Sequence, residues 1–183
     1  MLYIIRHGRT DWNDEERLQG RTDIPLNEEG RKMARKAAED FKDINFDIAF
    51  CSPLSRAKET AEILLEGRDI PIVFDERLLE MSFGVCEGMK YYFADPNTKV
   101  STFFRDPEHY TDPPEGAESM DELFERTGEF LREVVEPELS KGKDVLIVGH
   151  GAMNSAIICQ VKNIPRSEYW SAGLENCKLM RLK

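Results

Sequence analysis

Cysteine is scarce in this chain, and its spacing removes two common ways of building a site or a scaffold. The four cysteines lie far apart, and no two of them form a CxxC pair. Zinc knuckles and disulfide frameworks need cysteines at regular spacings, so the sequence favours neither. We expect reduced thiols, mostly buried in the core, at Cys51, Cys86, Cys159 and Cys177.

Long hydrophobic runs are also missing. A membrane-spanning helix needs about 20 apolar residues, and no run in the chain approaches that length. The apolar segment from Met1 to Ile5 is interrupted by Arg6, which makes it too short for the apolar region of a signal peptide. We therefore predict a cytoplasmic protein.

Positive charge is in short supply. The chain has 25 Lys and Arg residues against 35 Asp and Glu residues, a net charge of −10. Such a chain repels nucleic acid and anionic membrane surfaces at long range, so neither is an expected partner. A phosphate-bearing ligand would have to meet a local pocket of cationic side chains, and the oligomeric state is unknown from the sequence.

Two kinds of ligand-binding motif are absent as well. The chain has no Walker loop and no GxGxxG, which argues against the usual nucleotide cradles. Its three histidines form no HxH or HxxxH pair of the kind that binds a metal. We therefore expect neither a cofactor nor a metal.

What the chain has instead is a series of short, apolar, β-branched runs. Such runs predict strands that are buried on both faces, the pattern of a parallel sheet. Helical stretches separate them, one at 27–41 with Asn27 as its N-cap and one at 55–66 that ends before Gly67. The four runs lie at residues 2–5, 47–51, 70–74 and 144–149.

Further elements are expected in the second half of the chain. Ser119 and Glu122 have the spacing of a capping box, which begins an amphipathic helix that Pro137 should bend or end. Another helix follows Gly151. Residues 175–182 alternate enough for a last, antiparallel edge strand.

This order of elements predicts the α/β class. We expect a single domain over residues 1–183, a three-layer sandwich whose central sheet is mostly parallel with one antiparallel edge strand and has helices on both faces. Residues 90–116 are rich in prolines, aromatics and acidic side chains and show no clean periodicity. They predict a small cap insertion over a site.

Reactive side chains follow each of the four runs. Ligands of open α/β sheets bind beyond the carboxyl ends of the strands, so these positions should meet at one edge. Taken singly, each residue has an ordinary structural explanation, but packing alone does not explain their recurrence at equivalent positions. The residues are Arg6 and His7 after the first run, Arg56 after the second, Glu80 after the third and His150 after the fourth.

Two arginines and two histidines at one edge suit an anion with several oxygens, and guanidinium groups bind phosphate through paired hydrogen bonds. A neutral imidazole attacks phosphorus, and cationic neighbours keep it neutral by lowering its pKa. This gives His7 a reason to follow Arg6. Gly8 allows a close approach to the backbone, and amides at the start of the helix after Gly151 are expected to donate to the same oxygens.

Ordered motifs across nearly the whole chain carry a family resemblance. They are RHGRT at 6–10, WN at 12–13, RLQGRTDIPLNEEG at 17–30, SPLSRAKETA at 52–61, LLEMSFGVCEG at 78–88, PEGAES at 114–119 and VGHGAM at 148–153. With these motifs the chain resembles the histidine phosphatase superfamily, the phosphoglycerate mutase-like proteins. Gln19 and Gly20 match the QG that is common in its phosphatase branch.

The resemblance implies a role for each matching residue. His7 would be the nucleophile that becomes a phosphohistidine, and Glu80 would protonate the departing alkoxide and then deprotonate the water that releases phosphate. A nearby phosphate anion favours the protonated carboxyl that the first step requires. Arginines and histidines would carry the transition-state charge without a metal. The residues implied to bind phosphate or substrate are Arg6, Asn13, Gln19, Gly20, Arg56, His150, Gly151 and Ala152.

The chain departs from the family pattern at two places. Arg9 stands where the family often has glutamate; it either tunes the rim of the pocket or faces solvent, and we favour the second. Cys86 stands where the family's WEG motif has tryptophan, while Glu87 and Gly88 match the motif, and we interpret this change as weakening a packing feature only. Cys86 is expected to be a core residue and not a second nucleophile.

These observations predict a metal-independent, acid-type phosphomonoesterase that acts on a small phosphorylated metabolite. The alternative is a cofactor-dependent phosphoglycerate mutase, which needs more basic groups over its pocket than the cap offers with Lys90, Lys99 and Arg105. A third possibility is a phosphate-binding protein without turnover, which the joint presence of all five reactive residues argues against. The particular substrate stays open.

Overall fold

The structure is a computed structural model that describes residues 1–90 and 95–183. Strands of these residues form one mixed sheet in the order β3-β2-β4-β1-β5. Neighbouring strands are parallel except β1 and β5, which confirms the predicted α/β class with an antiparallel edge strand. The strands are β1 (Leu2–Arg6), β2 (Ile48–Cys51), β3 (Ile72–Phe74), β4 (Val145–Gly149) and β5 (Leu179–Arg181).

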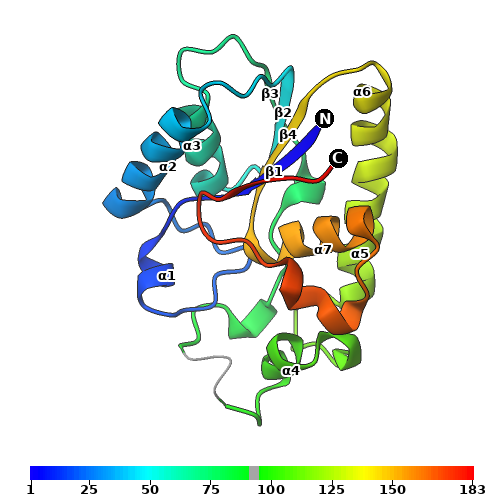
Figure 1. Cartoon of the computed structure of the whole chain (residues 1–183). Helices are drawn as coiled ribbons and strands as arrows, with labels where there is room; N and C mark the ends of the chain where they lie inside the picture. Colours follow the sequence, from blue (N-terminus) through cyan, green and yellow to red (C-terminus); the bar gives the residue numbers. More distant parts are fainter. Residues whose placement is uncertain (91–94) are drawn as a thin grey trace.

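Helices lie on both faces of the sheet (Figure 1). On one face are α2 (Glu28–Asp40) and α3 (Ser55–Leu64), and on the other are α5 (Met120–Phe130), α6 (Glu136–Ser140) and α7 (Gly151–Lys162). The remaining elements are short: α1 (Asp11–Asp14), α4 (Lys99–Arg105), a π-helical turn at Leu131–Val135, and 3-10 helices at Glu76–Leu78, Gly84–Cys86, Pro107–His109 and Arg166–Ala172.

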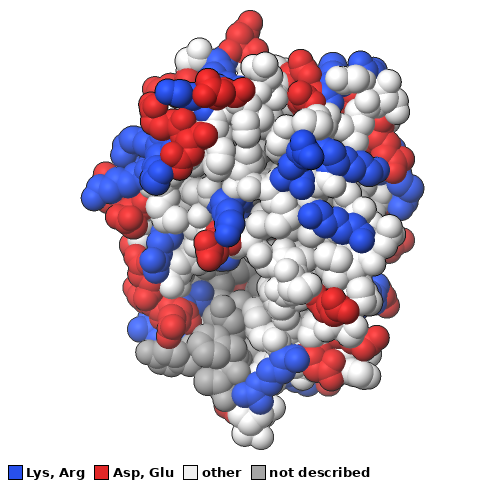
Figure 2. All heavy atoms as spheres, viewed as in Figure 1, with Lys and Arg blue, Asp and Glu red and all other residues white. Residues whose placement is uncertain are grey.

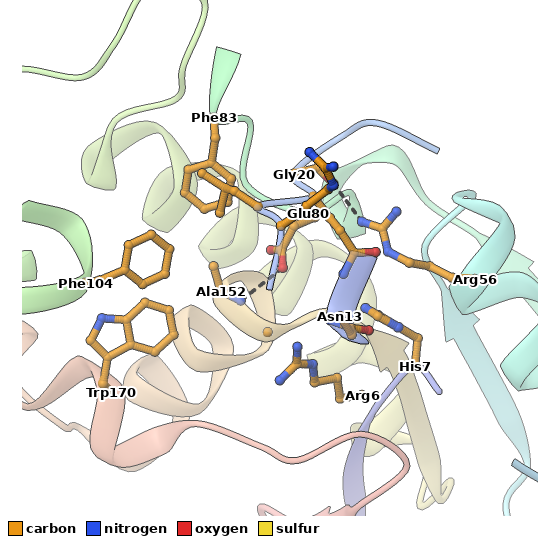
Figure 3. A pocket seen from close by; sticks show the side chains of 14 residues that line it. Arg6, His7, Asn13, Gly20, Arg56, Glu80, Phe83, Phe104, Ala152 and Trp170 are labelled. Carbon is orange, nitrogen blue, oxygen red and sulfur yellow. Dashed lines mark hydrogen bonds between the residues drawn. The ribbon is translucent and has the colours of Figure 1, made fainter. Parts of the chain in front are cut away.

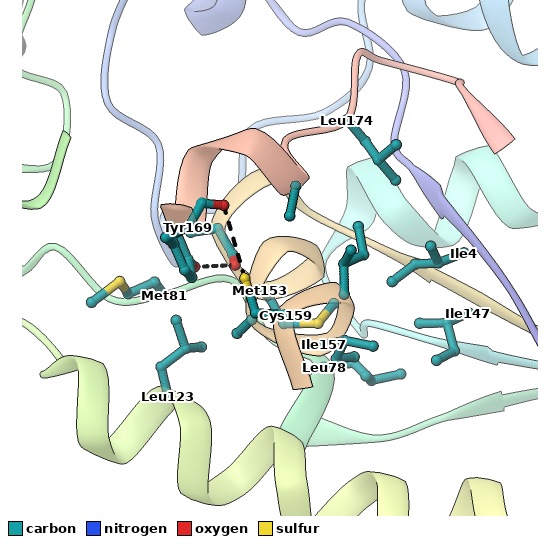
Figure 4. Packing of buried hydrophobic residues seen from close by; sticks show 14 of the residues in the cluster. Ile4, Leu78, Met81, Leu123, Ile147, Met153, Ile157, Cys159, Tyr169 and Leu174 are labelled. Carbon is teal, nitrogen blue, oxygen red and sulfur yellow. Dashed lines mark hydrogen bonds between the residues drawn. The ribbon is translucent and has the colours of Figure 1, made fainter. Parts of the chain in front are cut away.

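Two apolar clusters fill the space between the sheet and its helices. Side chains alternate along a strand, so Ile4 packs with the α5 and α7 side whereas Ile5 packs with the α2 and α3 side. Figure 4 shows the first cluster, in which Leu123 and Ile157 are fully buried against the sheet. Burial of each such side chain contributes about 1.5–3 kcal/mol, which fixes the strands whose ends carry the reactive residues.

Two helix starts follow the capping signals in the sequence. The side chain of Asn27 accepts a hydrogen bond from the Gly30 amide at the start of α2. Ser119 and Glu122 form a complete capping box at the start of α5, each side chain accepting from the backbone amide of the other. Both predicted N-termini are confirmed.

Pro137 does not end its helix. The chain continues in α6 as far as Ser140, because a π-helical turn precedes the proline and the Glu136 amide donates to the Leu131 carbonyl, five residues back. The wider turn places Pro137 in the first turn of α6, where a missing N–H leaves no acceptor unsatisfied. The sequence pattern alone does not report this change of helical register.

The expected cap contains a helix that periodicity did not reveal. In α4, Val100 and Phe103 are fully buried while the rest of this short element is largely polar. Fewer than two turns supply too few apolar positions for a periodic signal. Residues 91–94 of the expected cap lie outside the described residues.

Charges on the face drawn in Figure 2 are of both signs and interspersed, with uncharged surface between them. Within the described ranges no helix combines the length and the apolar character needed to cross a membrane. All four cysteines are buried and unpaired, as expected.

Candidate active site

The carboxyl ends of three strands meet at one edge of the sheet. β4 pairs in parallel with both β1 and β2, so the residues that follow them, His7, Ser52 and His150, are neighbours. A cavity of about 240 Å³ opens there (Figure 3). Its lining residues are Arg6, His7, Asn13, Arg17, Leu18, Gln19, Gly20, Arg56, Glu80, Phe83, Phe104, Gly151, Ala152 and Trp170.

The two ring nitrogens of His7 have different surroundings, and only Nδ1 has a backbone hydrogen-bond partner among the described residues. Its Nδ1 lies 2.6 Å from the carbonyl oxygen of Gly8, so Nδ1–H donates there and Nε2 keeps the lone pair. Burial, followed by the charges of Arg56 and Arg6, holds the pKa of His7 well below its usual range. The imidazole is therefore neutral and nucleophilic near neutral pH.

Gly8 is required by space. A Cβ at this position would lie 2.5 Å from the carbonyl oxygen of Gly30, which is backbone and has little freedom to move. The Gly8 amide donates to the hydroxyl of Thr60 at 3.0 Å, which ties the His7 loop to α3.

Arg56 lies in the first turn of α3 and is fully buried beneath the pocket. Its terminal nitrogens donate to the carbonyl oxygens of Gly20 at 2.6 Å and Thr22 at 2.9 Å. Burial lowers its pKa to about 10, which leaves the guanidinium charged at neutral pH. The buried Nε has no hydrogen-bond partner among the described residues, so one donor remains for an anion. Arg6 approaches from β1, anchored to the Leu174 carbonyl at 3.0 Å.

His150 follows β4 and is oriented by Ser52, a residue that the sequence analysis did not assign to the site. Ser52 Oγ lies 2.7 Å from His150 Nε2, the only acceptor that its hydroxyl reaches among the described residues, so the hydroxyl donates to the imidazole. Nδ1 then carries the imidazole proton and, within the described part of the chain, has no partner. Burial and the charge of Arg56 lower the pKa of His150. The ring thus offers a neutral donor.

Glu80 is bound to the start of α7. Its Oε1 accepts from the amides of Met81 at 2.8 Å and Met153 at 2.9 Å, and its Oε2 accepts from the Ala152 amide at 3.1 Å. The Ala152 amide, which was expected to face phosphate, is therefore turned toward this carboxylate, although Gly151 and Ala152 both line the cavity. Negative charge at a helix N-terminus is favourable, which explains the preference.

The predicted wall residues are arranged by Thr10. Asn13 Oδ1 accepts from the Thr10 amide at 3.1 Å in a capping box for α1, which leaves the Asn13 amide nitrogen as its donor group. Gln19 Oε1 accepts from the Thr10 hydroxyl at 2.8 Å. Both residues line the cavity, as does Gly20.

Glu87 has a structural role that the sequence analysis did not assign to it. Its carboxylate accepts from the amides of Arg21 and Thr22, both at 2.9 Å, and from the Phe83 amide at 3.1 Å. These bonds fix the loop whose carbonyl groups hold Arg56. The family's WEG glutamate was the available signal, and its link to Arg56 is visible only in three dimensions.

The other residues follow simpler rules. Arg9 is exposed, pairs with Asp14 at 2.6 Å and does not line the cavity, as expected for a solvated side chain. Cys86 is buried, and desolvation raises the pKa of its thiol, which argues against nucleophilic chemistry there. In residues 1–90 and 95–183, no three His, Cys, Asp or Glu side chains are grouped to hold a metal ion.

The arrangement combines three chemical capacities in one cavity. A neutral imidazole supplies a nucleophile, two guanidinium groups supply donors for an anion, and a carboxyl group lies beside them. The second imidazole, His150, is not among the lining residues and lies next to His7, with the two ring centroids 5.2 Å apart. Transfer of a phosphoryl group from a monoester needs this combination. The cationic groups neutralise charge on the phosphate oxygens while the imidazole nitrogen attacks phosphorus.

Comparison with known proteins gives the same family. The profile of the histidine phosphatase superfamily (branch 1) matches residues 2–183. The uncharacterized phosphatase PhoE of Bacillus subtilis is 39% identical over 158 residues, covering 86% of this chain and 75% of that protein. The 2,3-bisphosphoglycerate-dependent phosphoglycerate mutase 2 of Gloeobacter violaceus is 31% identical over 180 residues, covering 97% of this chain and 82% of that protein.

A solved structure agrees over nearly the same length. YhfR of Bacillus stearothermophilus superposes with a TM-score of 0.87 at 34% identity, covering 97% of this chain and 88% of that one. The fold, the ordered motifs and the relatives, which include both phosphatases and mutases, all indicate the same family. The chain belongs to branch 1 of the histidine phosphatase superfamily.

Proposed function

We propose that this protein is a metal-independent phosphomonoesterase that hydrolyses a small phosphorylated metabolite through a covalent phosphohistidine at His7. The observation that carries the proposal is the state of His7: its Nδ1–H is bound to the Gly8 carbonyl, and its pKa is held low by burial and by Arg56 and Arg6. The lone pair of Nε2 is thereby available at neutral pH beside groups that bind phosphate.

In the first step Nε2 of His7 attacks phosphorus, and the bond from phosphorus to the ester oxygen breaks. Glu80 gives its proton to that oxygen, so the alcohol leaves neutral. Oε2 is the oxygen suited to carry this proton, because it accepts only one backbone amide whereas Oε1 accepts two. Arg6, Arg56 and the Nδ1–H of His150 hold the phosphoryl oxygens.

In the second step water takes the place of the alcohol. Glu80, now a carboxylate, removes a proton from the water. The water oxygen bonds to phosphorus as the bond between phosphorus and His7 Nε2 breaks. Phosphate leaves, and both His7 and Glu80 return to their starting states.

The test is to trap the intermediate. Replacing His7 by Ala should abolish turnover of 4-nitrophenyl phosphate and the acid-labile labelled phosphoenzyme, whereas His109→Ala, a change at an exposed histidine outside the cavity, should leave both intact. Turnover should persist in a chelator. Labelled intermediate in the His7→Ala protein, or strict dependence on a metal, would overturn the mechanism.

The second candidate is phosphotransfer of the phosphoglycerate mutase type, which relatives such as the Gloeobacter violaceus mutase favour. A mutase must retain the released monoester until it is rephosphorylated. Interconversion of 2- and 3-phosphoglycerate, measured with and without a 2,3-bisphosphoglycerate primer, separates the two. Rapid transfer only with the primer would replace hydrolysis as the function.

A further inference from the structure

The cavity has two chemically different ends. One end holds the imidazole and guanidinium groups described above. Across from it, beyond Glu80 in Figure 3, the wall consists of the aromatic rings of Phe83, Phe104 and Trp170. Because the leaving alcohol departs on the Glu80 side of phosphorus, these rings face the part of the substrate that differs from one phosphate ester to another.

The aromatic wall is held in place by contacts among its own rings and with Phe103. The rings of Phe104 and Trp170 are stacked, with centroids 5.4 Å apart and planes 15° from parallel. The indole Nε1 of Trp170 donates to the carbonyl oxygen of Phe103 at 2.9 Å, and the fully buried Phe103 ring contacts Phe83, Phe104 and Trp170. A ring that binds here meets fixed surfaces and loses little to reorganisation of the protein.

The cationic groups of the lining are already committed. Arg6 and Arg56 lie at the phosphoryl end of the cavity. Arg17 is the other cationic residue among the described lining residues, and it pairs with Glu15 at 2.5 Å and donates to the Gly88 carbonyl at 2.9 Å. A substrate carboxylate placed against the aromatic wall would meet no free donor from the described rings, because the indole N–H of Trp170 is already bound to the Phe103 carbonyl, and an unpaired charge against the rings is costly.

From these observations we infer that the leaving-group end of the pocket takes an uncharged planar ring, so that the substrate class is phosphate monoesters of alcohols carrying an aromatic or heteroaromatic ring, and not phosphorylated hydroxy acids. This inference rests on the proposed function, since it assigns the alcohol to the Glu80 side. Aromatic faces favour planar rings over saturated ones of similar size, because stacking adds to the area buried.

The first experiment compares matched esters. Benzyl phosphate and cyclohexylmethyl phosphate are similar in size and in the basicity of the leaving alcohol, and 3-phosphoglycerate supplies a carboxylate. We expect kcat/KM for benzyl phosphate to exceed that for 3-phosphoglycerate by about tenfold or more and that for cyclohexylmethyl phosphate by a smaller factor. Equal values for all three, or a preference for 3-phosphoglycerate, would overturn the inference.

Variants then locate the preference. In Trp170→Leu, and separately in Phe104→Leu, the ratio of kcat/KM for benzyl over cyclohexylmethyl phosphate should fall to about one. A ratio measured within one variant is insensitive to partial loss of folded protein. Trp12→Phe is the matched control, because Trp12 does not line the cavity, and it should keep the wild-type ratio. A ratio unchanged in both leucine variants would remove the aromatic wall from recognition.

Binding without turnover separates this inference from the proposed function. In the Trp12→Phe protein, Trp170 is the only tryptophan. 4-Nitrobenzylphosphonate, which is not hydrolysed, should quench its fluorescence saturably, whereas methylphosphonate should not. Quenching in a protein that hydrolyses none of the esters would reject the phosphatase but keep the ring site. Hydrolysis without quenching would do the reverse.

Discussion

His7 and His150 extend from neighbouring parallel strands and bring their rings to a centroid separation of 5.2 Å, tilted by 58°. Each is buried, each has its pKa lowered first by desolvation, and each lies near the same arginines. Two neutral imidazoles can share this space, whereas two imidazolium ions would repel each other and the guanidinium groups. The pair therefore resists protonation as a unit.

This relationship predicts loss of stability in mild acid. A histidine whose pKa is lowered by folding contributes stability that is fully present above its unfolded value of 6.5 and is lost as the pH falls toward the native value. Below the unfolded value each such histidine contributes a slope of about 1.4 kcal/mol per pH unit, so the pair contributes about 2.8 kcal/mol per pH unit. Urea unfolding followed between pH 7.5 and 5.5 measures it.

Variants identify the titrating groups. His7→Asn should remove about half of the acid slope, and His109→Gln should change it little, because His109 is exposed and Asp106 raises its pKa instead. A full slope in a protein lacking both His7 and His150 would assign the effect to other groups.

A second prediction concerns Glu80, the proposed proton donor. Glu80→Gln should reduce turnover of alkyl phosphates by about 100-fold or more, since an alkoxide cannot depart without a proton. 4-Nitrophenyl phosphate should lose far less, because its leaving group is stable as an anion. The measurement is the dependence of kcat/KM on the basicity of the leaving group, which should steepen. The same loss for both esters would mean that Glu80 is not the proton donor.

Glu87 is predicted to act on the substrate through Arg56. In Glu87→Gln, an NH₂ group would replace one oxygen and face backbone amides that now donate to a carboxylate. Each amide that loses its acceptor in this way costs about 1–3 kcal/mol. We expect KM and the inhibition constant for phosphate to rise about tenfold while kcat changes less. Glu87→Asp should recover part of the affinity, and Glu66→Gln, at an exposed position, is the control. A fall in kcat with KM unchanged would contradict this role.

Two glycines provide a matched test of the same loop. Gly20 and Gly67 both have left-handed backbone, with φ of +57° and +74°. A Cβ at Gly20 would lie 2.1 Å from Glu87 Oε1, whereas one at Gly67 would meet nothing within 4 Å. Alanine at either position should cost about 1–2 kcal/mol of stability. Only Gly20→Ala should also weaken phosphate inhibition, and equal inhibition in the two variants would refute the coupling.

The sequence predicts the framework of this fold well because its signals are local. β-branched runs mark β1 and β4, and Asn27 and Ser119 mark helix starts, so each element is specified by residues within it. His7 and His150 could be assigned to one edge because parallel strands share a direction. Different roles for His7 and His150 were implied only by the family motifs.

What the sequence does not predict depends on partners far along the chain. The Ala152 amide was expected to face phosphate, but it donates a hydrogen bond to Glu80, which is distant in the sequence. The π-helical turn before Pro137 and the stacking of Phe104 on Trp170 likewise arise from tertiary packing, which no local pattern reports.

The anchoring of β1 makes the position of His7 depend on a segment that is far away in the sequence. The Arg6 carbonyl accepts from the Cys177 amide, the His7 carbonyl accepts from the Asn176 side chain, and Arg6 itself donates to Leu174. Arg6 and Leu174 are 168 residues apart in the sequence, and His7 and Asn176 are 169 apart. Removal of the stretch from Leu174 to Cys177 would therefore take away three hydrogen bonds that hold the carboxyl end of β1, although none of its residues lines the cavity.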